Sequence, residues 1–231
     1  MIGTLINAAL IVLGSSLGLL LRRGFSERIR QAVMMAMGLS TILIGLSGAL
    51  KTSDTLCLIL CMGLGSLLGS ALNLELRIDH LGKKLEGLFT QSDGQNGSIS
   101  RGFVTTTLIY CVGAMAIVGS IDSALRGDHS TLIAKGIIDG LTAVVFASSL
   151  GFGVMLSAAS VLVYQGAIAL LATLLSPLLT DIMISEMSAV GGLLIAGIGL
   201  NLLYDKHIPV GNMLPAIFLP LVYLPVSTLL G

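Results

Sequence analysis

Long apolar stretches separated by short polar breaks occupy most of the chain. A membrane-spanning helix needs about 20 predominantly apolar residues to cross a hydrocarbon core of about 30 Å. Eight stretches have this character: 2–21, 29–50, 55–72, 103–121, 132–150, 152–175, 182–204 and 210–230. The pattern predicts an all-α fold, a polytopic membrane helix bundle with about seven or eight transmembrane helices. The fifth stretch, with Lys135 and Asp139, and the eighth, with several prolines, fit the pattern least well.

Composition excludes a soluble globular domain. Of the 231 residues, 55% are hydrophobic and only 10% are charged, whereas soluble domains average about 25% charged residues. The formal net charge is zero, and the chain lacks the basic stripe that a nucleic-acid partner would need. The three cysteines lie inside apolar stretches and are too few for a disulfide framework. We therefore expect the lipid bilayer to be the main partner.

Basic residues are distributed unequally over the polar breaks. Lys and Arg near helix ends are retained on the cytoplasmic side of a membrane. With the N-terminus outside, nine basic residues fall on one side (Arg22, Arg23, Arg28, Arg30, Arg77, Lys83, Lys84, Arg101 and Lys206) and three on the other (Lys51, Arg126 and Lys135). We therefore expect a multi-pass chain with its N-terminus outside and residues 73–101 in the cytoplasm. If all eight stretches span, the C-terminus also lies outside.

The cytoplasmic segment divides the chain. Leu74, Ile78, Leu81, Leu85 and Leu88 recur at helical spacing between charged residues, which predicts an amphipathic helix. This helix rests on the membrane or bundle, or else it binds a partner. Residues 90–101 are polar and rich in Gly and Ser, as in a flexible linker. We expect one transmembrane domain, 1–231, with a three-helix group at 1–72, the helix and linker at 73–101, and a second helix group at 102–231.

Pairs of glycines four residues apart occur in two of the predicted helices. Gly14 and Gly18 lie in the first and Gly65 and Gly69 in the third; such pairs let membrane helices approach closely. A fainter similarity relates the glycines of the second helix to those around Gly191 and Gly192 in the seventh. It indicates either an inverted repeat of spans 1–3 and 6–8 or simply a shared glycine-rich composition. The same glycine faces could pack within one chain or in a homo-oligomer.

Three polar residues within the apolar stretches are candidates for an ion or solute pathway. An ionisable group at membrane depth costs about 2.5–3.5 kcal/mol on insertion scales, so Asp139 is the strongest candidate. It forms a cation or proton site, or else a structural pair with Lys135 four residues earlier. Gln165 lines a solute path or makes a hydrogen bond between helices. Glu186 contributes to a polar mouth at the outer surface, or it sits at a solvated helix start.

The eighth stretch carries a different signal. Pro215, Pro220 and Pro225 each remove a backbone donor and kink or break a helix. Gly211 and Asn212 precede them as a polar hinge. Freed backbone at membrane depth is tolerated where it is buried in protein or lines a water-filled cavity. The stretch is therefore either part of a pathway or a kinked packing helix.

The spans show no cluster of reactive side chains. His80, His129 and His207 fall in the breaks, and Cys57 and Cys61 are ordinary packing residues, so we expect no metal site. Phosphate-binding, dinucleotide-binding and catalytic motifs are missing from the sequence. We expect neither a catalytic residue nor a cofactor, and hence no enzyme.

Several segments together resemble the YdfK/YqgA family of bacterial inner-membrane proteins, whose function is unknown. They are 2–4 (IGT), 14–18 (GSSLG), 65–69 (GSLLG), 139–140 (DG), Ser157, 161–166 (VLVYQG), 186–192 (EMSAVGG), 199–201 (GLN) and 210–215 (VGNMLP). The resemblance covers nearly the whole chain. It implies placement in the bacterial inner (plasma) membrane and directs attention to Asp139, Gln165, Glu186, Asn201 and Asn212. It implies no substrate.

Two functions follow as hypotheses. The first is a transporter or channel for a small ion or small solute, with a pathway formed by Asp139, Gln165, Glu186, Asn201, Asn212 and Pro215. The second is a membrane scaffold or sensor that transports nothing and acts through its cytoplasmic amphipathic helix. Replacement of Asp139 separates the two, because only the first needs that carboxylate.

Overall fold

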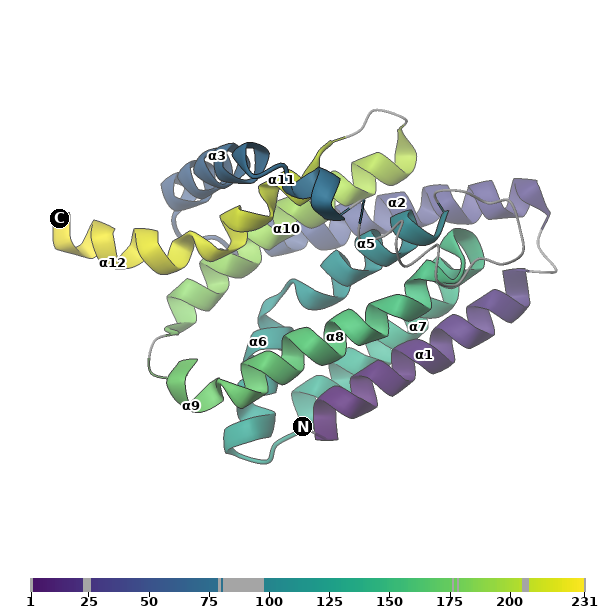
Figure 1. Ribbon diagram of the computed structural model, residues 1–231, viewed down its shortest axis with the longest axis horizontal. Coiled ribbons are helices and arrows are strands. Elements are labelled where there is room, and N and C mark those ends of the chain that lie inside the picture. Colours follow the sequence, from purple (N-terminus) through teal and green to yellow (C-terminus); the bar gives the residue numbers. More distant parts are fainter. Residues whose placement is uncertain are drawn as a thin grey trace. The chain divides into compact units, whose positions relative to one another are not determined.

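The computed structural model describes residues 2–22, 26–78, 80, 98–175, 177, 179–204 and 208–230, and these contain helices and no strand. The helices are α1 (Ile2–Arg22), α2 (Glu27–Ala49), α3 (Thr55–Ala71), α5 (Ser98–Cys111), α6 (Ala114–Leu125), α7 (Ser130–Leu150), α8 (Gly153–Leu170), α9 (Ala172–Leu175), α10 (Asp181–Leu203), α11 (Val210–Met213), the 3-10 helix η1 (Leu214–Phe218) and α12 (Pro220–Leu230) (Figure 1). The predicted all-α fold is confirmed. Residues 74–78 are helical, but most of the predicted amphipathic helix and linker lies outside the described residues.

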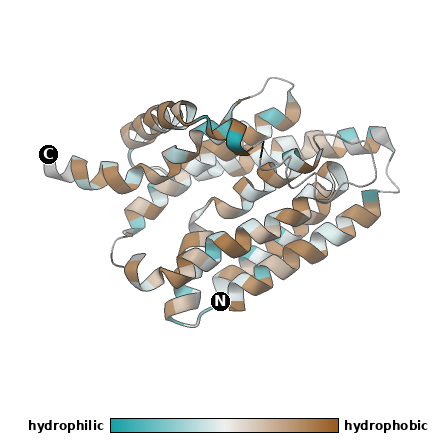
Figure 2. Cartoon of the chain, in the orientation of Figure 1, coloured by the Kyte–Doolittle hydropathy of each residue, from teal (hydrophilic) through white to brown (hydrophobic). Residues whose placement is uncertain are grey.

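Each of the eight predicted stretches contains helix. Within the described ranges, five helices are long and apolar enough to cross a membrane: α1, α2, α7, α8 and α10. Two bent pairs, α5 with α6 and the segment α11–η1 with α12, raise the number to seven if each pair is one span. The apolar helix α3 is shorter, at 17 residues. Apolar residues cover these helices along most of their length (Figure 2), as expected for a protein that faces lipid.

The fourth stretch is not the continuous helix that its hydrophobicity predicts. It breaks between α5 and α6, where Gly113 has φ of 132°, a conformation that residues with a Cβ rarely adopt. The fifth stretch, by contrast, forms one unbroken helix of 21 residues, α7. Its two charged side chains lie one turn apart on the same face, so they pair with each other without interrupting the helix.

The eighth stretch is interrupted, as its prolines indicate. Pro215 lies in the 3-10 helix η1, and the axis bends by 41° before the helix that Pro220 begins. A proline within η1 or at the first position of α12 needs no intrahelical donor. Pro225 is inside α12.

The described residues form two compact units. Unit 1 consists of Met1–Met37, Ile78–Cys111 and Met115–Thr173, and unit 2 of Gly38–Arg77, Val112–Ala114 and Leu174–Gly231. Each unit therefore combines helices from both of the sequence groups predicted on either side of the linker.

Close glycine contacts hold the helices of unit 1 together. Helix α1 runs alongside α7 (Figure 1) in the same direction, since Gly3 faces Leu132, Gly14 faces Gly140 and Gly18 faces Val144. A methyl group on Gly14 or Gly18 would collide with the facing backbone of α7. Such backbone approach is what small residues permit between membrane helices.

Unit 2 uses the same kind of contact. On α3, Gly65 lies against the backbone of Ala216 and Gly69 against that of Asn212. On α10, Gly192 meets the backbone of α2 at Gly45 and Ala49, and Gly191 packs against Val112. The pairs at 14/18, 65/69 and 191/192 thus all lie at tight helix contacts.

Candidate functional site

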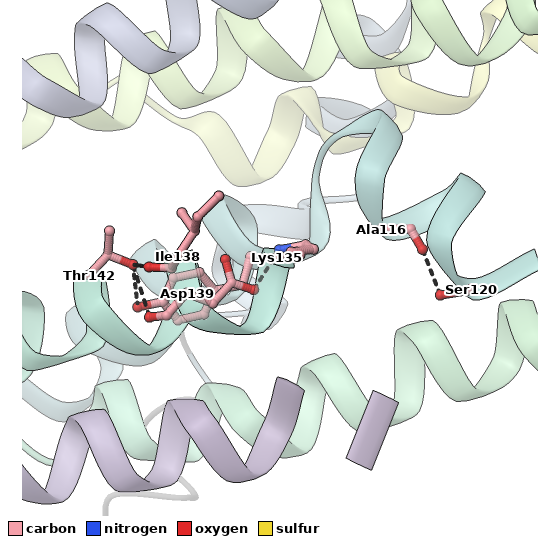
Figure 3. Close-up of polar contacts among 7 residues, drawn as sticks. Ala116, Ser120, Lys135, Ile138, Asp139 and Thr142 are labelled. Atoms are coloured by element: carbon pink, nitrogen blue, oxygen red, sulfur yellow. Dashed lines mark hydrogen bonds and ion pairs between the residues drawn. The ribbon is translucent and has the colours of Figure 1, made fainter. Parts of the chain in front are cut away.

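A buried ion pair lies within α7 of unit 1. Lys135 and Asp139 are 6% and 5% exposed, and the Nζ of Lys135 donates a hydrogen bond to Oδ2 of Asp139 at 2.5 Å (Figure 3). Their four-residue spacing places both side chains on one face of the helix. Buried charges are retained only when they are paired, because removing one partner leaves an uncompensated charge.

An aromatic ring of helix α5 lies close to this pair. The side chain of Tyr110 is fully buried, and the Nζ of Lys135 lies 6.0 Å from the centre of its ring. An ammonium at this distance is attracted by the electrons of the ring face. Tyr110 lies in the last turn of α5, which ends at Cys111. Its ring therefore offers Lys135 a second attractive group besides Asp139.

Helix α1 brings an amide to the pair. Asn7 is fully buried and its backbone lies against Gly136 of α7. Its side chain faces the carboxylate of Asp139. Neither the amide nitrogen nor the amide oxygen of Asn7 completes a hydrogen bond of normal geometry with any described residue.

Gln165 of α8 lies at the same depth as the ion pair. Asp139 precedes Gly151 by twelve residues (151 − 139), and Gln165 follows Gly153 by twelve (165 − 153). At a rise of 1.5 Å per residue, both lie about 18 Å from the turn that joins α7 and α8. Helix α8 packs against α1, α5 and α7, so Gln165 belongs to the same bundle as Lys135, Asp139, Asn7 and Tyr110. We call these five residues the unit 1 polar cluster.

The amide of Gln165 in this cluster has no hydrogen-bond partner among the described residues. Gln165 is fully buried, and within the described part of the chain neither its Nε2 nor its Oε1 has a hydrogen-bond partner. A buried polar group without a partner costs about 1–3 kcal/mol. Waters or ions commonly satisfy such groups. Asn7 beside the ion pair and Gln165 in the same bundle can therefore each offer an amide to an ion or a small polar solute.

Glu186 in unit 2, unlike Gln165, has several hydrogen-bond partners. Its carboxylate accepts hydrogen bonds from the Thr52 hydroxyl at 2.5 Å, from the Ser53 amide at 2.7 Å and hydroxyl at 2.9 Å, and from the Asp54 amide at 3.3 Å. The side chain is fully buried, so the expectation of a solvated helix start is wrong. The turn between α2 and α3 folds over the start of α10 and shields Glu186 from solvent.

The remaining predicted residues, Asn201, Asn212 and Pro215, also lie in unit 2, and the two asparagines make hydrogen bonds to its backbone. The amide of Asn201 donates to the carbonyl of Ile208 and accepts from its N–H, both at 2.8 Å. Asn212 accepts a hydrogen bond from the backbone N–H of Glu75 at 2.9 Å, and Pro215 belongs to η1. Glu186 and Asn201 lie fifteen residues apart (201 − 186) on one helix, about 22 Å. Unit 2 therefore does not bring its four predicted pathway residues together.

A family model described as "Protein of unknown function (DUF554)" matches residues 2–224. The chain belongs to this family. It is 32% identical over 224 residues to the "Uncharacterized membrane protein YdfK" of Bacillus subtilis, covering 95% of this chain and 94% of that protein. It is 36% identical over 220 residues to the "Uncharacterized protein YqgA" of Escherichia coli, covering 94% of each. No solved structure matches the chain. The predicted family is confirmed, and the chain is a membrane protein.

Two members of the cluster in this DUF554 chain, Asn7 and Tyr110, were not predicted from the sequence. Asn7 is the one amide side chain in α1 and lies within a largely apolar run. That position could have marked it as a candidate polar contact between helices. Tyr110 has no such signal, because tyrosines are common in membrane helices. Among the described residues, no group of three His, Cys, Asp or Glu side chains is placed to hold a metal ion.

Proposed function

We propose that this DUF554 protein is a transporter or channel for a small ion, with a pathway through the unit 1 polar cluster. One observation carries the proposal: the buried pair Lys135–Asp139 faces the fully buried amide of Asn7, and the same bundle holds the fully buried amide of Gln165, which has no hydrogen-bond partner among the described residues. A purely structural pair needs no unsatisfied neighbours. An ion or a water bound at this depth would satisfy such an amide.

The proposed pathway is narrower than the sequence analysis predicted. Within unit 1, Asp139 and Gln165 belong to one bundle with α1 and α5. Glu186, Asn201 and Asn212 each have hydrogen-bond partners inside unit 2. Those contacts support a structural role for them, and the proposal assigns the ion to Asp139 rather than to these residues.

The proposal includes a location. The relatives come from two bacteria, and one is described as a membrane protein. Together with the nine-to-three distribution of basic residues, this supports the bacterial inner membrane, with the N-terminus outside.

The test is an ion-flux screen with the purified full chain in liposomes. Gradients of Na⁺, K⁺, Li⁺, H⁺, halides and divalent cations are applied in turn, and flux is recorded with ion-sensitive dyes. We expect flux of at least one ion above that of protein-free liposomes, and at least a tenfold loss for Asp139→Asn. Asp128→Asn, an exposed carboxylate in the loop before α7, is the matched control and should retain the wild-type rate. Absence of flux for every ion, or equal flux by Asp139→Asn, would refute the proposal.

A further inference from the structure

Two thiols meet on one face of α3 in unit 2. Cys57 and Cys61 lie one helical turn apart, and their Sγ atoms are 3.8 Å from each other. Both side chains are buried, at 0% and 2% exposure. The same face of α3 continues through Gly65 and Gly69, which contact the backbone of η1 and α11. The thiols therefore point into unit 2 and away from lipid.

The distance between the two sulfur atoms suits two bonds to one metal ion. Thiolate–metal bonds are about 2.3 Å long, so sulfur atoms 3.8 Å apart form an angle of about 110° at a shared ion. A straight S–metal–S arrangement needs about 4.6 Å, twice the bond length, which is less than 1 Å more. A disulfide fits less well. Side chains four residues apart on a helix have Cβ atoms about 5–6 Å from each other, whereas a disulfide needs about 3.5–4.5 Å.

The set of ligands selects the class of metal. Among the described residues, no third His, Cys, Asp or Glu side chain completes a metal-binding group with these thiols. Structural zinc sites use four ligands, and Ca²⁺ and Mg²⁺ bind to oxygen. Sulfur ligands select soft cations such as Cu(I), and two sulfur atoms are sufficient for a soft monovalent ion.

Two carboxylates near the thiols favour a cation. The carboxylate of Asp54 accepts a hydrogen bond from the backbone N–H of Cys57 at 3.0 Å, and Glu186 accepts one from the backbone N–H of Asp54 at 3.3 Å. Both carboxylates act electrostatically on Cys57 and Cys61. Their oxygens are bonded to the turn before α3, so they contribute negative potential and leave the bonding to sulfur.

We propose that Cys57 and Cys61 form a binding site for a soft monovalent metal cation, of the class of Cu(I) and Ag(I). On binding, the S–H bond of one thiol breaks and its proton leaves to water. The freed electron pair of that sulfur and a lone pair of the other sulfur form the two bonds to the cation. No electron is transferred, and the charge of the site does not change. The site lies in unit 2 and is separate from the ion pathway proposed for unit 1.

The test measures silver bound to the purified full chain in chloride-free buffer. Silver nitrate is added, an excess of a monothiol removes ions that are held by a single sulfur, and the metal content per chain is measured by mass spectrometry. We expect about one silver ion per wild-type chain. Cys57→Ser and Cys61→Ser each replace a soft ligand by a hydroxyl and should retain at least tenfold less. Cys111→Ser removes a single thiol of unit 1 and, as the matched control, should retain the wild-type amount.

A second measurement does not depend on the folding of any variant. X-ray absorption of the silver-loaded wild-type protein should show two sulfur neighbours per silver ion. One sulfur neighbour, no silver retained by the wild type, or wild-type retention by Cys57→Ser or Cys61→Ser would overturn the site. Loss of silver from Cys111→Ser would also overturn it, because the ion would then be bound in unit 1. The liposome screen does not involve these thiols, so the two proposals succeed or fail separately.

Discussion

Two buried carboxylates in this chain have contrasting surroundings. Glu186 accepts hydrogen bonds from three consecutive residues, Thr52, Ser53 and Asp54, so its oxygens are fixed by the turn they stabilise. Asp139 accepts a hydrogen bond from the flexible side chain of Lys135 and faces the amide of Asn7. The carboxylate of Asp139 therefore has fewer fixed donors than that of Glu186. The proposed ion site is therefore assigned to Asp139, which the sequence also marks as the stronger candidate of the two.

Gln165 provides a test of function against stability. A leucine of similar volume would remove two unsatisfied polar atoms from a buried position, and each costs about 1–3 kcal/mol. We expect Gln165→Leu to leave the thermal stability of the detergent-solubilised protein unchanged or raised, and to reduce ion flux at least tenfold. Ser157→Ala is the control on the same helix. Within the described ranges, the hydroxyl of Ser157 donates a hydrogen bond inside α8, to the carbonyl of Val154, so its loss should leave flux intact. A marked loss of stability in Gln165→Leu would show that the amide has a structural partner.

At the scale of the helices, glycine position determines packing. On α3, Gly65 and Gly69 lie against the backbone of η1 and α11, whereas Gly63 points into open space. All three glycines sit inside one helix and have the same intrinsic helix propensity. Differences among their alanine variants therefore report packing alone.

We expect Gly69→Ala to destabilise unit 2 by about 1–3 kcal/mol, because a methyl group would collide with the backbone of Asn212. Gly63→Ala should be neutral or stabilising by up to about 1 kcal/mol, through the better helix propensity of alanine. Thermal unfolding in detergent measures both. Equal stability of the two variants would contradict the close contact between α3 and α11.

The helices themselves were largely predictable, because their apolar length reflects the thickness of the bilayer. The interruption of the last stretch was also predictable, since Pro215 and Pro220 cannot continue an α-helix. The break at Gly113 was not, because most glycines in membrane helices mark close packing and only the backbone angle reveals a turn. The contact of Asn7 with α7 was not predictable either, because hydrophobicity does not specify which helices pack against each other.

At the scale of the whole molecule, the two compact units combine segments from distant parts of the chain, with α2 contributing to both. The predicted helix groups on either side of the polar linker follow chain order alone, and they stay a prediction. Contacts such as Gly14 with Gly140 cross more than a hundred residues, and helix-to-helix complementarity of this kind has no signature in a single sequence.

The orientation of the chain can be tested directly. With the N-terminus outside, the predicted topology places residue 92 in the cytoplasm and residue 128 outside. Ser92→Cys and Asp128→Cys are introduced separately, and intact cells are treated with a membrane-impermeant thiol reagent. We expect labelling of Asp128→Cys in intact cells and of Ser92→Cys only after lysis. The unsubstituted chain, with its Cys57, Cys61 and Cys111, is the control for background labelling. The reverse pattern would invert the topology.

The most direct test of the ion pathway is tracer uptake into liposomes containing equal amounts of wild-type, Asp139→Asn or Asp139→Glu protein. Radioactive sodium and rubidium ions serve as probes. The account predicts saturable uptake of at least one of them by the wild type and uptake at the protein-free background by Asp139→Asn. Asp139→Glu, which keeps a carboxylate, should retain part of the rate. Uptake by Asp139→Asn equal to that of the wild type, or no uptake above background by any of the three, would contradict the central role given to Asp139.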